Sequence, residues 1–97
     1  MAKFELPIID FAKDEVKKTY ERNFLPTEIY IESREISERA EDMREIELLE
    51  ELCKLFERLF PELTEDEFWN NTDPAYILAL YRDILTKSTK IVSPKNA

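Results

Sequence analysis

The 97-residue sequence contains no glycine. Glycine is the residue that most readily adopts the positive φ angles of tight turns, so a sheet of many strands is difficult to build without it. Turns in this chain have to be built from Pro, Asn, Asp and Ser instead. The composition therefore favours a fold dominated by helices.

The start of the sequence predicts a β-hairpin over residues 3–24. Apolar and other residues alternate in two runs, which is the period-two pattern of half-buried strands. The residues expected on the buried side are Phe4, Leu6 and Ile8 in the first strand and Val16, Tyr20 and Phe24 in the second. Because a lone hairpin is marginally stable in water, we expect this side to pack against helices.

Four segments after the hairpin predict helices. Their expected bounds are about 28–42, 45–60, 65–70 and 74–87. Thr64 and Glu67 have the spacing of a capping box, which marks the start of the third helix. A single helix over 28–60 would be about 50 Å long, too long for a compact domain of this size. We therefore expect a break near Asp42.

These elements predict an α+β, mostly α fold, in which the hairpin packs on a small bundle of three to four helices. The chain has the length of one domain, and its 43% hydrophobic residues can fill one core. We expect residues 1–90 to form this domain. Residues 91–97 are expected to be a mobile tail, because the end of the chain is polar and basic and contains Pro94.

Negative charge is concentrated in the middle of the chain. Residues 28–67 carry fifteen acidic and five basic residues, a net charge of −10, within a total of −8. Such a charge repels nucleic acid and anionic membranes, so we expect neither as a partner. The simplest interpretation is that the acidic residues solvate helix faces. No signal segment or apolar span is evident, and the single cysteine indicates no internal disulfide, so we expect a cytoplasmic protein.

The residue types disfavour catalysis. The sequence has no histidine, so Ser-His-Asp, Cys-His and HExxH sites are excluded. Cys53 lies on the apolar face of a predicted helix, where an inert buried thiol is expected. We identify no catalytic, cofactor-binding or metal-binding residue, and we expect a protein that is not an enzyme and uses no cofactor.

The segment 45–60 has a broad apolar stripe that covers about half of the helix circumference. A hairpin and one short helix cannot readily cover this much apolar surface, so part of the stripe is a candidate surface for a partner helix or another copy of the chain. Trp69 is a candidate exposed aromatic contact. The candidate partner-binding residues are Leu48, Leu52, Leu55, Leu59 and Trp69.

Several stretches of the sequence are similar to small tail assembly chaperones of long-tailed, siphovirus-type phages and prophages of Gram-positive bacteria. They are residues 4–8 (FELPI), 19–24 (TYERNF), 26–27 (PT), 60–68 (FPELTEDEF), 71–73 (NTD) and 84–90 (ILTKSTK). The resemblance covers nearly the whole chain, whereas residues 31–50 contribute nothing to it. No single stretch has the specificity of a metal or nucleotide motif.

The resemblance implies a protein that acts in the host bacterial cytoplasm before the tail is assembled. It would hold the tape-measure protein soluble and help to recruit the major tail protein around it. A longer form made by a ribosomal frameshift is common in this family. The partners implied are therefore the tape-measure protein and the major tail protein, with a homo-oligomer also possible.

Two other classes of function remain open from the residues themselves. One is a structural or adaptor module that acts through homo-oligomerisation of the leucine edge. The other is an acidic regulator that mimics nucleic acid, which would require carboxylates spaced like phosphates on one face.

Overall fold

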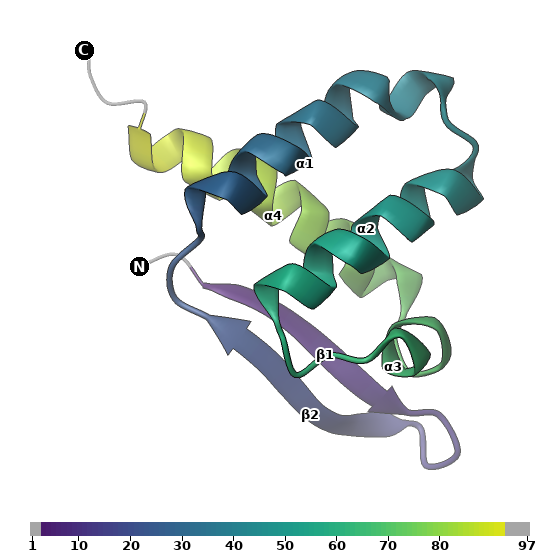
Figure 1. Cartoon of the computed structure of the whole chain (residues 1–97). Coiled ribbons are helices and arrows are strands. Elements are labelled where there is room, and N and C mark those ends of the chain that lie inside the picture. Colours follow the sequence, from purple (N-terminus) through teal and green to yellow (C-terminus); the bar gives the residue numbers. More distant parts are fainter. Residues whose placement is uncertain (1–2, 93–97) are drawn as a thin grey trace.

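The computed structural model describes the backbone of residues 3–92 and the side chains of residues 3–87. The chain forms a two-stranded antiparallel sheet followed by four α-helices (Figure 1). The elements are β1 (Phe4–Asp10), β2 (Glu15–Arg22), α1 (Thr27–Arg39), α2 (Glu45–Leu59), α3 (Glu65–Asn70) and α4 (Pro74–Val92). The predicted α+β, mostly α fold with an N-terminal hairpin is confirmed.

The hairpin contains a β-bulge. Ile8 lies opposite Lys18 and Ile9 lies opposite Val16, so Lys17 is an extra residue in β2. The turn between the strands is closed by Asp14 at φ 55°, in the left-handed region that Asp tolerates better than most residues. The chain thus uses an aspartate where a glycine would be the usual choice.

Because of the bulge, the buried side of the second strand differs from the predicted alternation. Tyr20 lies opposite Leu6 and shares its side of the sheet, whereas the bulge removes Val16 from that side and leaves it 54% exposed. Phe24 lies beyond the end of β2 and is 78% exposed. Of the three apolar residues expected on the buried side of this strand, only Tyr20 packs against the core.

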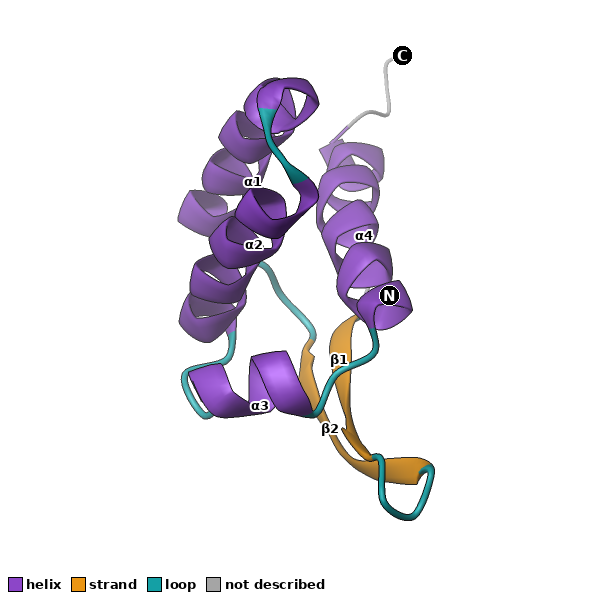
Figure 2. Cartoon of the chain, turned by 90° about the vertical axis from the view of Figure 1, so that its right-hand side faces the viewer, coloured by secondary structure: helices purple, strands orange, loops and turns teal. Residues whose placement is uncertain are grey.

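The helices lie on one side of the hairpin, and α2 supplies the largest share of the core (Figure 2). β1 buries Phe4, Leu6 and Ile8, and α4 packs against this strand. α1 packs against both α2 and α4. The apolar stripe of α2 therefore packs against α1 and α3, and its buried residues share one core cluster with residues of the hairpin and α4.

The segment from residue 28 to residue 60 is divided into two helices. A short 3-10 turn, Ala40–Asp42, follows α1, and Met43 is extended at φ −100° and ψ 144°. The carboxylate of Glu47 then accepts a hydrogen bond from the backbone N–H of Arg44 at 2.9 Å, which caps the start of α2. The chain reverses here, and the radius of gyration is 13.9 Å. The break lies next to Asp42, where it was expected.

The last helix is longer than predicted. α4 ends at Val92 rather than at residue 87, so residues 91–92, which were expected in a mobile tail, continue the helix. The pattern of the sequence changes to polar residues before this point, but no proline or glycine interrupts residues 75–92. The rest of the expected tail, residues 93–97, lies outside the described residues. Within residues 3–92, none of the helices combines the length and the apolar character that crossing a membrane requires.

Candidate functional site

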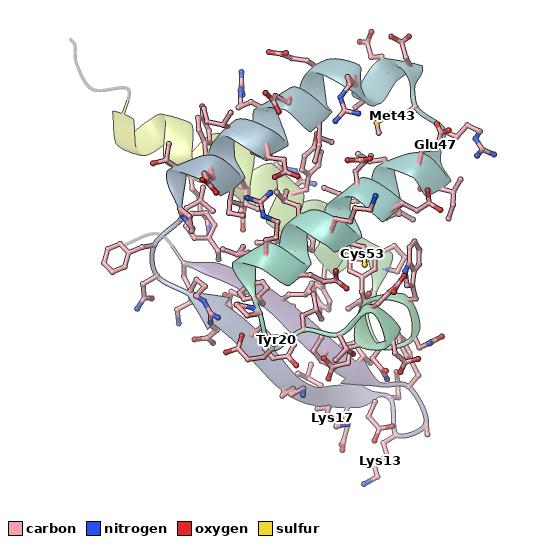
Figure 3. The ribbon with its side chains drawn as sticks, viewed as in Figure 1. Lys13, Lys17, Tyr20, Met43, Glu47 and Cys53 are labelled. Carbon is pink, nitrogen blue, oxygen red and sulfur yellow. The ribbon has the colours of Figure 1, made fainter. Side chains whose placement is uncertain are left out.

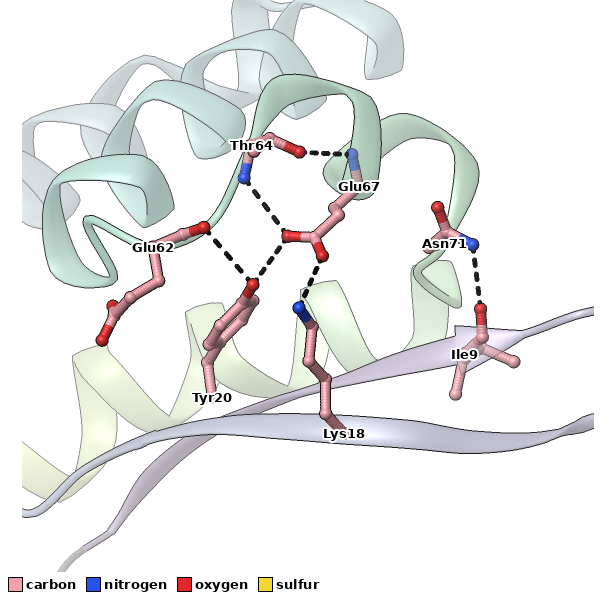
Figure 4. A network of polar contacts seen from close by, with 7 residues as sticks. All are labelled: Ile9, Lys18, Tyr20, Glu62, Thr64, Glu67 and Asn71. Atoms are coloured by element: carbon pink, nitrogen blue, oxygen red, sulfur yellow. Dashed lines mark hydrogen bonds and ion pairs between the residues drawn. The ribbon is translucent and has the colours of Figure 1, made fainter.

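Helix α3 is fastened to the hairpin by a network of polar contacts (Figure 4). The Glu67 carboxylate accepts from the Thr64 backbone N–H at 3.3 Å, and the Thr64 hydroxyl accepts from the Glu67 N–H at 3.1 Å. This is the capping box that the sequence predicted. The same carboxylate also accepts from the Tyr20 hydroxyl at 2.7 Å and forms an ion pair with Lys18 at 2.9 Å. Glu67 therefore joins the start of α3 to strand β2.

The electrostatics of this network favour a charged Glu67. Partial burial works against the charged form, but hydrogen bonds from Lys18, Tyr20 and the Thr64 backbone outweigh it and lower the pKa of Glu67. Partial burial, together with the hydrogen bond to Glu67, raises the pKa of Tyr20. At neutral pH the network thus holds one carboxylate, one ammonium and one neutral phenol.

A second set of contacts fixes the other end of α3. The backbone N–H of Ile9 donates to the carbonyl oxygen of Asn71 at 2.7 Å, and the Asn71 side-chain amide donates to the carbonyl oxygen of Ile9 at 3.0 Å (Figure 4). The Thr72 hydroxyl donates to the carbonyl oxygen of Phe68 and closes the helix. Because both ends of α3 are held, the side chains that it presents have fixed positions.

The two aromatic residues of α3 point in different directions. Phe68 is fully buried and meets Phe56 of α2 edge to face, with ring centroids 6.1 Å apart. Trp69 remains 39% exposed and packs edge to face on Phe68, with centroids 5.1 Å apart and an interplanar angle of 82°. The Trp69 indole therefore packs on a buried ring and is still accessible to a partner.

Trp69 lines a groove of about 440 Å³ between α2 and α3. The residues that line this groove, called the α2–α3 groove below, are Glu50, Cys53, Lys54, Glu57, Glu65 and Trp69. Figure 3 shows Cys53 on the side of α2 that is next to α3. The four residues from α2 share one helix face, and Glu65 lies one turn before Trp69 on α3.

The α2–α3 groove is negatively charged. Among residues 3–87, whose side chains are described, Glu50, Glu57 and Glu65 form no ion pair. The thiol of Cys53 donates to Glu57 at a distance of 3.8 Å. Burial, followed by the negative charges of Glu57 and Glu65, raises the pKa of Cys53 to about 12. The Cys53 thiol is therefore neutral, and the carboxylates of Glu57 and Glu65 near it have no ion-pair partner among residues 3–87.

A second groove, of about 450 Å³, runs between α1 and α2, but its charges are largely balanced within the chain. The guanidinium of Arg58 forms ion pairs with Glu28 and Glu32 across this groove. Arg39, also in the lining, pairs with Glu51 at 3.9 Å. A charged partner would have to displace these contacts, so this groove is the weaker candidate.

The structure places the predicted partner-binding residues in two different environments. Leu52 and Leu55 are fully buried, Leu59 is 3% exposed and Leu48 is partly buried against the same core. Leu52, Leu55 and Leu59 therefore do not form the open edge that was expected, because they belong to one core cluster with residues of the hairpin, α1 and α4. Of the five candidates, only Trp69 is exposed.

The three carboxylates around Trp69 were not predicted as site residues, because acidic residues spaced in this way along a helix are typical of a solvated face. The spacing of Glu50, Cys53 and Glu57 does place them on one face of α2. However, the position of α3 across that face depends on the polar network with the hairpin, and no sequence pattern indicates it.

No protein-family model, curated protein or solved structure matches this chain. The described geometry presents a half-exposed tryptophan, on a helix held at both ends, beside three carboxylates that lack a cationic partner among residues 3–87. This arrangement is suited to binding a cationic or amphipathic group by contact.

Proposed function

We propose that this protein is a tail assembly chaperone, which binds the tape-measure protein, keeps it soluble and helps to recruit the major tail protein in the cytoplasm of the host bacterium. The proposal rests on the resemblance to such chaperones of residues 4–8, 19–24, 26–27, 60–68, 71–73 and 84–90. The structural observation that carries it is the exposed Trp69, fixed over the α2–α3 groove.

An exposed tryptophan on a rigid support is typical of a protein-binding surface. Tryptophan is enriched among the residues that contribute most to binding at protein interfaces. The contacts of Glu67 and Asn71 hold α3 before any partner arrives, so little ordering of the binding surface has to accompany association. Trp69 is therefore our candidate for the main client contact.

The charge distribution supports a holding role. A net charge of −8 opposes self-association of a small domain through mutual repulsion. The alternative adaptor role, which depended on homo-oligomerisation through the leucine edge, loses its surface because Leu52, Leu55 and Leu59 are buried.

Co-expression with fragments of the tape-measure protein from the same genome tests the proposal. We expect wild-type protein to raise the soluble yield of one or more fragments and to co-elute with them in size-exclusion chromatography with light scattering. We expect Trp69→Ala to lose this effect. Phe24→Ala, which changes another exposed aromatic residue outside the α2–α3 groove, should retain it.

Fragments that stay insoluble, with the wild-type chain eluting alone, would overturn client holding. The mass of that lone peak would show whether the protein instead associates with itself. Circular dichroism of Trp69→Ala ensures that a lost complex does not reflect a lost fold.

A further inference from the structure

Cations contact aromatic rings in a consistent way in this protein. Lys18 lies 5.1 Å from the ring centroid of Tyr20 and pairs with Glu67, and Arg22 lies 5.3 Å from that of Phe60 and pairs with Glu62. Lys87 lies 5.9 Å from the ring centroid of Phe4 and pairs with Asp83 at 3.2 Å. Each cation is thus shared between an aromatic ring and a carboxylate.

The α2–α3 groove provides two of the three groups of this arrangement, an aromatic ring and carboxylates. Trp69, the aromatic type that attracts cations most strongly, is beside Glu50, Glu57 and Glu65. Within residues 3–87 no cation lies over the Trp69 ring and none pairs with these carboxylates. Lys54 is in the lining, but it forms no ion pair with any described side chain.

We propose that the α2–α3 groove binds a lysine or arginine side chain of a partner polypeptide, held between the Trp69 indole and the carboxylates of Glu57 and Glu65. The inference rests on the proposed function and adds the chemistry of the client segment. Arginine fits better than lysine, because a planar guanidinium can stack on the indole while it donates to two carboxylates.

Charge complementarity supports this assignment. The lining of the α2–α3 groove contains three carboxylates, Glu50, Glu57 and Glu65, and one cation, Lys54, so its net charge is negative. By contrast, the groove between α1 and α2 already holds Arg58 between Glu28 and Glu32. A cation from a partner is therefore directed to the α2–α3 groove.

A pair of synthetic helical peptides provides the probe. One peptide carries arginines along one face, and the matched peptide carries glutamine at the same positions. Trp69 is the single tryptophan of the chain, so its fluorescence reports on the groove directly when the peptides contain none. We expect the arginine peptide to change Trp69 emission and to bind about tenfold or more tightly than the glutamine peptide, with affinity that falls as salt is raised.

Charge-neutralising variants separate the groove from general acidity. Glu57→Gln combined with Glu65→Gln should weaken binding of the arginine peptide by about tenfold. Glu38→Gln combined with Glu41→Gln makes the same change in net charge at exposed positions outside the groove and should leave affinity unchanged. Equal affinity for both peptides, or equal loss in both double variants, would overturn the proposal.

The two proposals can fail independently. If wild-type protein and the Glu57→Gln, Glu65→Gln variant hold tape-measure fragments equally well, the cation site is wrong and client holding stands. If the arginine peptide binds selectively but all fragments stay insoluble, the cation site stands and the chaperone function is wrong.

Discussion

The hydroxyl of Tyr20 donates a hydrogen bond to Oε1 of Glu67 across 2.7 Å, and this contact joins residues that are 47 positions apart in the sequence. Glu67 is at the same time the third residue of α3, and its carboxylate completes the capping box with the N-cap residue Thr64. The position of α3, and with it that of Trp69, therefore depends on a carboxylate that the hairpin holds. Substitutions of Tyr20 and Glu67 therefore test how the α2–α3 groove is held in place.

Removing the hydroxyl of Tyr20 should weaken the fold without disturbing the core. Tyr20→Phe keeps the stacking on Phe60, whose ring centroid is 5.8 Å away, and removes the hydrogen bond to Glu67. We expect the free energy of unfolding to fall by about 1 kcal/mol. Urea unfolding followed by circular dichroism measures this change, and an unchanged midpoint would show that the contact contributes nothing to stability.

The acid stability of the protein should depend on Glu67. Its pKa in the folded state lies below the ordinary value of 4.5, so the folded state binds fewer protons at this site than the unfolded state. The stabilisation is fully present above 4.5 and is lost as pH falls through the lowered folded-state pKa. Glu67→Gln should therefore lower stability at neutral pH and flatten the acid limb of the stability curve.

Glu41→Gln provides the control for this measurement, since Glu41 is exposed on the turn after α1. Its stability curve should follow that of the wild type within about 0.5 kcal/mol. If Glu67→Gln and Glu41→Gln give the same curve, the lowered pKa of Glu67 is not linked to folding.

The thiol of Cys53 should be unreactive in the native protein. Its pKa of about 12 leaves almost no thiolate at mildly alkaline pH, and the residue is only 4% exposed. Iodoacetamide should modify it slowly in buffer and rapidly in denaturant, as mass spectrometry can follow. Equal rates in both conditions would contradict the described environment of Cys53.

Charged substitutions in the leucine stripe should lower the stability of the protein rather than weaken a binding surface. Leu52→Asp places a charge in a fully buried position, so we expect the protein to unfold or fail to express in soluble form. Leu55→Ala should cost about 2–5 kcal/mol through the cavity that it leaves. A folded, fully soluble Leu52→Asp protein would show that this stripe is accessible after all.

Sequence patterns were sufficient for the elements that local residues specify. The alternation of Phe4, Leu6 and Ile8 predicted β1, and the spacing of Thr64 and Glu67 predicted the start of α3. The break next to Asp42 followed from the size of the domain. Each of these features depends on neighbouring residues or on overall dimensions.

Features that depend on contacts between distant residues could not be predicted. The bulge at Lys17 removes Val16 from the side of β2 on which Tyr20 lies, and no residue pattern marks it. Leu55 is buried in a core cluster that the hairpin, α1, α2 and α4 build together, which the stripe of α2 does not specify. The groove beside Trp69 exists because α3 is held against the hairpin.

The emission spectrum of Trp69 during titration with a soluble tape-measure fragment that lacks tryptophan tests whether the α2–α3 groove binds the client. We expect a saturable change in emission, with an affinity that falls when Glu57 and Glu65 are neutralised and that stays constant in Phe24→Ala. A fragment that binds while Trp69 emission stays unchanged, and that binds Trp69→Ala with the wild-type affinity, would show that the α2–α3 groove is not the client-binding surface.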